Sequence, residues 1–209
     1  MKHPVLHPGL NLGPHHGTAH DDAETGAFGF WVFLMSDLII FGLMFATYAT
    51  MANPTGMAGG PGPKEAYDLG SVFAQTMILL TSSLTFGLAS LAMRHEQGRR
   101  ITAVWLCVTL ALGLAFLTLE MRDFIHMIDS GAVPSRSGFL SAFFGLVPLH
   151  GLHVIAGCIW IIVMLSQMAA FGMISIVKTR LVRLGLFWHF LDLIWVGIFT
   201  IVYLGGLAT

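Results

Sequence analysis

Two polar pairs stand inside long apolar stretches of this 209-residue chain. His150 and His153 lie three residues apart, and so do His189 and Asp192. Residues with this spacing share one face of a helix. An ionisable group at membrane depth costs roughly 2.5–3.5 kcal/mol to insert, so each needs a partner or a function. Two isolated carboxylates extend the candidate set to Asp37, Glu120, His150, His153, His189 and Asp192.

These residue types suit four kinds of site. Two helices that each offer a polar pair, with a carboxylate from a third, are similar to carboxylate-bundle metal sites. Two of the histidines suit axial haem ligation. The carboxylates suit a proton or ion path. Hydrogen bonding between the fourth and fifth helices is the favoured interpretation, and the residue types leave the other three open.

The elements that position these groups are membrane helices. Hydrophobic residues make up 56% of the chain and charged residues 10%, against about 25% charged in a soluble domain. Apolar runs of about 18 residues or more are typical of transmembrane helices. The sequence therefore predicts an all-α fold, an integral membrane bundle of five transmembrane helices in a domain over residues 28–209. The expected spans are 28–51, 71–93, 101–122, 137–171 and 183–205.

Other features bound the function further. Residues 1–27 form a polar, histidine-rich segment, for which a mobile tail is a better interpretation than a metal site. Cys107 and Cys158 fall within spans and are expected to be packing residues. The few basic residues sit at helix ends rather than in a patch, which argues against nucleic-acid binding.

Basic residues predict the orientation. The second and fourth loops, which must share one side, carry most of them, namely Arg94, Arg99, Arg100, Lys178, Arg180 and Arg183. Because cytoplasmic loops carry an excess of Lys and Arg, the N-terminus is expected in the cytoplasm and the C-terminus in the periplasm.

The second span carries many small and hydroxyl-bearing residues. Ser83 and Gly87 are four apart, a small-xxx-small pattern that allows helix backbones to approach closely. A path lined by hydroxyls is the alternative interpretation.

Three sequence blocks resemble subunit III of haem-copper terminal oxidases. They are the run 136–144, the HGLHV block at 150–154 and the FWHFLDLIW block at 187–195. Residues 30–37 (FWVFLMSD) look like the start of the core that the family shares. The five-span form and the Gly-Pro loop at 59–64 most resemble the bo-type ubiquinol oxidases of bacteria.

The resemblance implies a non-catalytic subunit of a respiratory oxidase in the bacterial inner membrane. In that family haem and copper belong to subunit I, which reduces O2 to water and pumps protons. Subunit III supports assembly, holds phospholipid and sustains proton uptake, so subunit I is the expected direct partner, with subunits II and IV in the complex. The polar set then has a structural role, with no catalytic, cofactor-binding or metal residue.

The resemblance also places Asp37 where cytochrome c oxidase members carry a carbodiimide-reactive glutamate. Two alternatives stay open. One is subunit III of a cytochrome c oxidase, and the other is a stand-alone proton or ion carrier that uses Asp37, Glu120 and Asp192.

Overall fold

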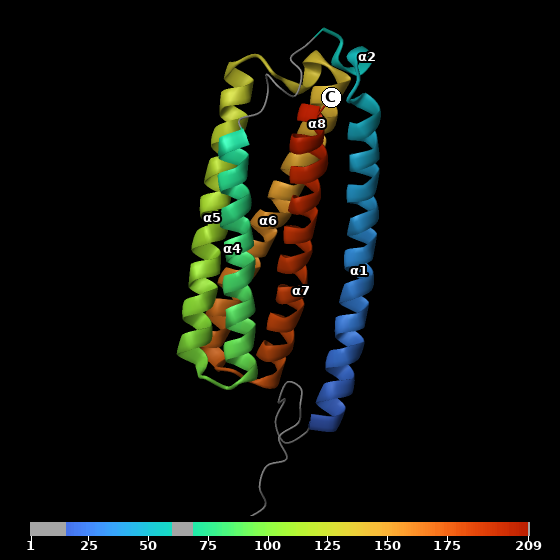
Figure 1. Cartoon of the computed structure of the whole chain (residues 1–209). Coiled ribbons are helices and arrows are strands. Elements are labelled where there is room, and N and C mark those ends of the chain that lie inside the picture. The colour runs from blue at the N-terminus through green and yellow to red at the C-terminus, as the bar shows by residue number, and fades with distance from the viewer. Residues whose placement is uncertain (1–15, 60–68, 209) are drawn as a thin grey trace, which may run out of the picture.

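The described residues are helical almost throughout. The computed structural model describes residues 16–59 and 69–208, and its five long helices run side by side (Figure 1). Their bounds are α1 His16–Met51, α4 Leu69–Arg94, α5 Arg99–Asp129, α6 Gly138–Phe171 and α7 Ser175–Gly197. The last helix continues through a π-helical stretch, η2 Ile198–Leu204, into α8 Gly205–Ala208. Two short elements, α2 Pro54–Met57 and η1 Pro134–Arg136, lie in the connections.

Five stretches of these helices are long and apolar enough to cross a membrane, which confirms the prediction of a five-helix, all-α bundle. The helices extend beyond the predicted spans, most clearly α1, which begins at His16, twelve residues before the predicted start at 28. At its C-terminal end α5 continues to Asp129, seven residues past the predicted end at 122. The expected tail is helical from His16 onward, whereas residues 1–15 lie outside the described part. Hydropathy marks only the apolar portion of a helix, while backbone hydrogen bonding continues into polar sequence.

The helices form a closed arrangement. α4 pairs with α5, α5 with α6, and α6 with α7, and α7 returns to α4. α1 packs against α6 and α7. The start of α1 and the α4–α5 and α6–α7 turns lie at one end of the bundle, and the C-terminus lies at the other (Figure 1).

Trp188 of α7 fills the centre of this arrangement. Its side chain is 2% exposed, and it lies between Gly113 of α5 and Gly157 of α6. A Cβ atom at either glycine would lie 2.9 Å from the indole. These two glycines therefore allow the helices to close around the ring.

The Ser83–Gly87 pattern does not mark such a contact within the chain. A Cβ atom at Gly87 would meet nothing within 4 Å. Ser83 meets His189 of α7, but among the described residues no neighbouring helix approaches closely at Gly87.

Candidate functional site

Asp37 and His153 meet between α1 and α6. The Asp37 Oδ2 atom lies 3.8 Å from His153 Nε2, and Asp37 is 8% exposed. His153 Nδ1 lies 2.8 Å from the Leu149 carbonyl oxygen, to which it donates. This hydrogen bond fixes the ring so that Nε2 faces the carboxyl group, and the pair links the first helix to the rest of the bundle.

His150 occupies an aromatic cage. Its side chain is fully buried, and its ring centroid lies 6.5 Å from that of Phe41, 6.0 Å from Phe116 and 5.2 Å from Trp195. Among the described residues, neither ring nitrogen has a hydrogen-bond partner. Packing rather than hydrogen bonding therefore holds this ring.

Glu120 of α5 is also buried, at 5% exposure. Its carboxylate lies against Gly151 of α6, where a Cβ atom would be 2.8 Å from Oε2. The Oε1 atom has no hydrogen-bond partner within the described part of the chain. Gly151 thus makes room for a carboxyl group that the helix interface leaves partly unpaired.

His189 and Asp192 lie near α4. His189 Nδ1 and the Ser83 hydroxyl are 2.8 Å apart, and the Ser83 side chain also interacts with the Asp192 carboxyl group. His189 is exposed, Asp192 is half-buried, and the buried Asp192 Oδ1 has no partner among the residues described.

The six predicted residues therefore occupy separate places instead of one cluster. Asp37 pairs with His153 and His189 with Ser83, whereas His150 lies in its aromatic cage. Across residues 16–59 and 69–208, no group of three or more His, Cys, Asp or Glu side chains is placed to hold a metal ion. The donor sets do not fit a haem or a metal centre, because the imidazoles face different neighbours.

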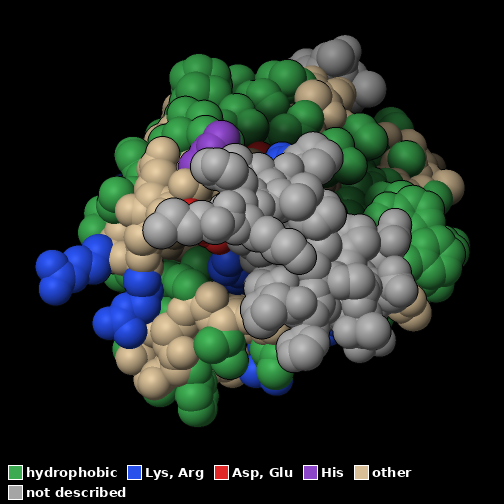
Figure 2. All heavy atoms as spheres, turned by 90° about the horizontal axis from the view of Figure 1, so that it is seen from below, with side chains coloured by type: hydrophobic (Ala, Val, Ile, Leu, Met, Phe, Trp, Pro, Cys, Tyr) green, Lys and Arg blue, Asp and Glu red, His purple; other side chains and the backbone are tan. Residues whose placement is uncertain are grey.

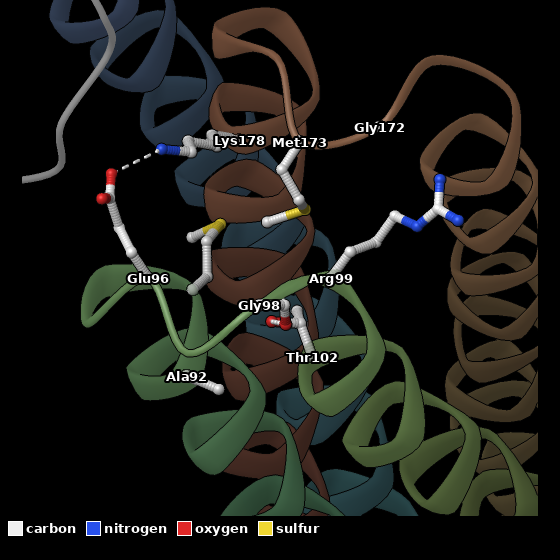
Figure 3. Close-up of a pocket in the computed structure, with 9 residues that line it drawn as sticks. Ala92, Glu96, Gly98, Arg99, Thr102, Gly172, Met173 and Lys178 are labelled. Atoms are coloured by element: carbon white, nitrogen blue, oxygen red, sulfur yellow. Dashed lines mark hydrogen bonds and ion pairs between the residues drawn. The ribbon is translucent and has the colours of Figure 1, made fainter.

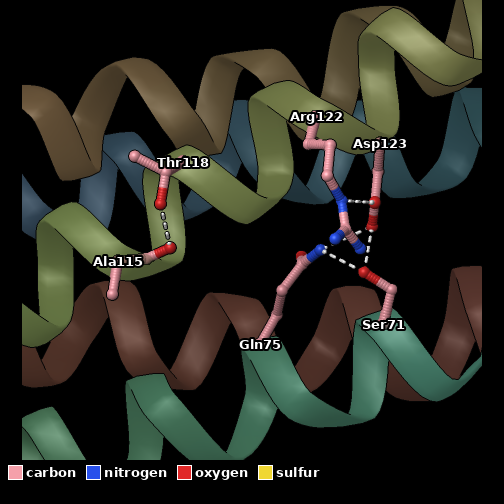
Figure 4. A network of polar contacts seen from close by, with 6 residues as sticks. All are labelled: Ser71, Gln75, Ala115, Thr118, Arg122 and Asp123. Carbon is pink, nitrogen blue, oxygen red and sulfur yellow. Dashed lines mark hydrogen bonds and ion pairs between the residues drawn. The ribbon is translucent and has the colours of Figure 1, made fainter.

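A further polar cluster, which the sequence did not predict, joins α4 to α5 (Figure 4). Asp123 Oδ2 accepts hydrogen bonds from the Ser71 hydroxyl at 2.6 Å and from Gln75 Nε2 at 2.7 Å. Arg122 Nε lies 3.6 Å from the other carboxylate oxygen. Ser71 and Gln75 lie four residues apart in an otherwise apolar helix, and this spacing is the signal from which the cluster could have been predicted.

The hydroxyl groups of α4 also hold its neighbours. The Trp188 indole donates to Ser82 Oγ at 3.1 Å, and the Trp195 indole donates to Thr76 Oγ1 at 3.0 Å. Thr85 and Thr109 hydroxyls pair at 2.8 Å between α4 and α5. These hydroxyls make contacts between helices, which argues against the hydroxyl-lined path.

A cavity of about 440 Å³ lies between the α4–α5 and α6–α7 turns (Figure 3). Lys178 Nζ lies 3.4 Å from Glu96 Oε1 at its edge. Arg99 Nη1 donates to the carbonyl oxygens of Met168 and Ala169, at 3.1 and 3.3 Å, near the end of α6. These contacts tie the two turns together at one end of the bundle.

Comparison with known proteins places these features in a family. The family model described as cytochrome c oxidase subunit III matches residues 10–207. Subunit 3 of the cytochrome bo(3) ubiquinol oxidase of Pseudomonas aeruginosa is 46% identical over 195 residues, which cover 93% of this chain and 92% of that protein. The Pseudomonas putida counterpart is 45% identical over 187 residues, 90% of this chain and 89% of that protein.

A relative with lower sequence identity aligns over a similar share of both chains. Quinol oxidase subunit 3 of Bacillus subtilis is 39% identical over 189 residues, 89% of this chain and 91% of that protein. The chain belongs to the cytochrome c oxidase subunit III family, as its sequence blocks predicted.

Proposed function

We propose that this member of the cytochrome c oxidase subunit III family is the third subunit of a bacterial bo-type ubiquinol oxidase and holds no redox centre itself. The similarity to the Pseudomonas aeruginosa ubiquinol oxidase subunit carries the proposal, because it spans more than nine-tenths of both chains. The similarity to quinol oxidase subunit 3 of Bacillus subtilis supports it. The name of the family model keeps a cytochrome c oxidase as the alternative.

The polar side chains support a structural role for this subunit. Asp37 and His153 link α1 to α6, and Ser83 and His189 link α4 to α7. In this proposal haem and copper belong to subunit I, which reduces O2 to water and pumps protons. This chain packs on the flank of subunit I, holds phospholipid there, and so supports assembly and sustained proton uptake.

The charge distribution supports a cytoplasmic N-terminus. Lys and Arg side chains are visible on the end of the bundle that carries the α4–α5 and α6–α7 turns (Figure 2). The N-terminal end of α1 lies at the same end. By the positive-inside rule this end faces the cytoplasm, so the C-terminus faces the periplasm of the inner membrane. Alkaline phosphatase is active only outside the cytoplasm, so the enzyme fused to the C-terminus of this chain is expected to be active.

Purification through an affinity tag on this chain tests the proposal. We expect haem-bearing chains to co-purify, with oxygen uptake supported by ubiquinol and not by reduced cytochrome c. Preference for reduced cytochrome c would favour the alternative oxidase. A tagged chain that purifies alone and moves protons or ions in liposomes would instead indicate a stand-alone carrier.

Deletion of the gene for this chain distinguishes a role in supporting the complex from a direct role in catalysis. We expect the remaining complex to keep near-normal haem content while its assembly or its durability during turnover falls. Loss of all haem from a complex that still assembles would contradict the non-catalytic role.

A further inference from the structure

The cavity between the α4–α5 and α6–α7 turns lies at the level of the membrane surface. The candidate membrane spans end at Arg94 and Phe171 and begin again at Arg99 and Ser175, and the residues that line the cavity fall within 92–102 and 172–178. The headgroup layer of a bilayer is about 5–8 Å thick on each side of the hydrocarbon core. The cavity, of about 440 Å³, therefore lies at the depth of lipid phosphates and within reach of dissolved anions.

Positive charge prevails around this cavity. Residues 94–102 and 172–183, which contain both turns, hold six Lys or Arg and one carboxylate, Glu96. Two of these cations, Arg99 and Lys178, line the cavity together with Glu96. The side chain of Lys178 is 12% exposed, whereas that of Glu96 is 58% exposed. Water and salt therefore screen the carboxylate more than the ammonium group, which leaves the cavity with a positive potential.

Arg99 keeps hydrogen-bond donors that the bundle does not use. Its Nη1 group bonds the carbonyl oxygens of Met168 and Ala169, and among the described residues its Nε and Nη2 groups make no hydrogen bond. Guanidinium donors match the oxygens of a phosphate. In the view of Figure 3, the Arg99 and Lys178 side chains lie on opposite sides of Met173. The two cations thus border one space from two different helices.

The backbone at this end of the bundle adds to the same preference. Carbonyl groups near the ends of α4 and α6 accept hydrogen bonds, from the amides of residues 95–97 and from Arg99. By contrast, no described side chain caps the first amides of α5 at Gly98 or of α7 at Ile174. The negative ends of these helix dipoles are covered while the positive ends are not, which supports the two cations in favouring an anion.

From this arrangement we infer that the cavity binds a phosphate group between Arg99 and Lys178, with the Met93 and Met173 side chains against the uncharged part of the same molecule. The headgroup of an anionic phospholipid and dissolved inorganic phosphate both supply this chemistry, and the experiments below separate the two sources. The inference goes beyond the proposed function and does not require it, because this chain alone forms the cavity.

Native mass spectrometry of the purified complex tests for the bound group. The complex is stripped of lipid in detergent and then exposed to short-chain phosphatidylglycerol or to phosphatidylcholine of the same chain length. We expect one phosphatidylglycerol to be retained per copy of this chain, with phosphatidylcholine held at least about fivefold more weakly, the contribution of one cation near a membrane surface. Equal retention of the two lipids would overturn the inference.

Inorganic phosphate at matched ionic strength distinguishes the two sources. If phosphate displaces the retained phosphatidylglycerol at concentrations where chloride does not, the site accepts the phosphate group alone. If phosphate and chloride act alike, the site is specific for the lipid headgroup. When neither phosphatidylglycerol nor phosphate is retained, the inference is wrong.

Substitutions in the cavity are expected to have opposite signs. Lys178→Gln and Arg99→Gln each remove a cation and should weaken retention of phosphatidylglycerol about fivefold. Glu96→Gln removes the one carboxylate among the lining residues that the structure describes, and should strengthen retention about twofold, since that group is largely exposed. The matched control, Arg100→Gln, changes an exposed cation of the same turn that does not line the cavity, and should leave retention within about twofold.

A purely structural ion pair predicts a different pattern. Because Lys178 and Glu96 are partners, loss of either would then lower both lipid retention and the temperature of thermal unfolding. That parallel loss would overturn the inference. So would equal effects of the Lys178, Arg99 and Arg100 variants, because total surface charge would then bind the lipid. A tagged chain that purifies alone can be tested in the same way, so failure of the proposed function leaves this test decisive.

Discussion

Replacing Trp188 by alanine is expected to be among the most destabilising single changes in this chain. The indole is 2% exposed, stacks on Phe86 at 6.5 Å between centroids and donates to Ser82. Substitutions of buried tryptophan by alanine cost about 3–5 kcal/mol in soluble proteins. Lipid is itself apolar, so the transfer contribution shrinks and lost packing dominates. We therefore expect a loss of about 3 kcal/mol.

The glycines around the indole allow a sharper test. A methyl group at Gly157 would lie 2.9 Å from Trp188 Cζ3, and overpacking of this kind costs about 1–3 kcal/mol. In a Trp188→Ala chain the same methyl group meets the space that the indole vacated. Gly157→Ala is therefore expected to destabilise the natural chain and to have little effect in the Trp188→Ala background, which is a coupling energy of similar size.

Unfolding in mixed micelles, titrated with SDS and followed by circular dichroism, measures the four free energies of unfolding in this cycle. Leu114→Ala, at a side chain that is 47% exposed on α5, provides the control and should change the free energy by no more than about 0.5 kcal/mol. Equal costs of Gly157→Ala in both backgrounds would refute the reasoning, because the glycine would then be needed for something other than space for Trp188.

Two further predictions concern the ends of the bundle. Asp123→Leu leaves the donors Ser71 and Gln75 without their acceptor, which is expected to cost about 1–3 kcal/mol of stability for each group that stays buried and unpaired. Asp123→Asn keeps one acceptor oxygen and should cost less, and thermal unfolding in detergent ranks the two variants. Arg99→Ala removes the hydrogen bonds to the end of α6, so amide hydrogen exchange in the α6–α7 turn should accelerate, while Arg100→Ala, at an exposed position, should leave it unchanged.

The sequence predicted the five helices because each carries a bilayer-sized apolar run, and it predicted the family from blocks that include both polar pairs. The favoured interpretation placed hydrogen bonds between the fourth and fifth helices, but His189 pairs with Ser83 of α4 and His153 with Asp37 of α1. Helical spacing shows which residues share a face, but not which helix that face meets. His150 and His153 share a face of α6, yet His153 lies beside Asp37 of α1 while His150 packs among aromatic rings.

Contacts between distant positions were missed for the same reason. Asp123 lies 52 residues from Ser71 in the chain, and their hydrogen bond forms only because α4 and α5 pair in one register. The spacing of small residues likewise did not show which positions contact another helix of this chain. Ser83 and Gly87 have the spacing of a close helix contact, but the glycines that make room for Trp188 are Gly113 and Gly157.

Substitution of His150 tests whether the histidines at membrane depth ligate a metal, form hydrogen bonds or only pack against their neighbours. Both of its ring nitrogens are buried without a hydrogen-bond partner in the described part of the chain. Replacing a buried polar group that makes no hydrogen bond by an apolar group of similar size is nearly neutral or stabilising. His150→Leu is therefore expected to keep or raise the free energy of unfolding, by at most about 1 kcal/mol.

His153→Leu provides the contrast, because it removes the hydrogen bond to Leu149 and the contact with Asp37. It should destabilise the chain by about 0.6–1.7 kcal/mol, the range of hydrogen bonds between membrane helices. The visible spectrum of the assembled complex should be the same with either variant, since neither imidazole ligates a haem in this proposal. A clear loss of stability in His150→Leu would mean that this ring does bond a polar neighbour such as Glu120, and a changed haem spectrum would mean that it is a ligand. Either result would refute packing as its role.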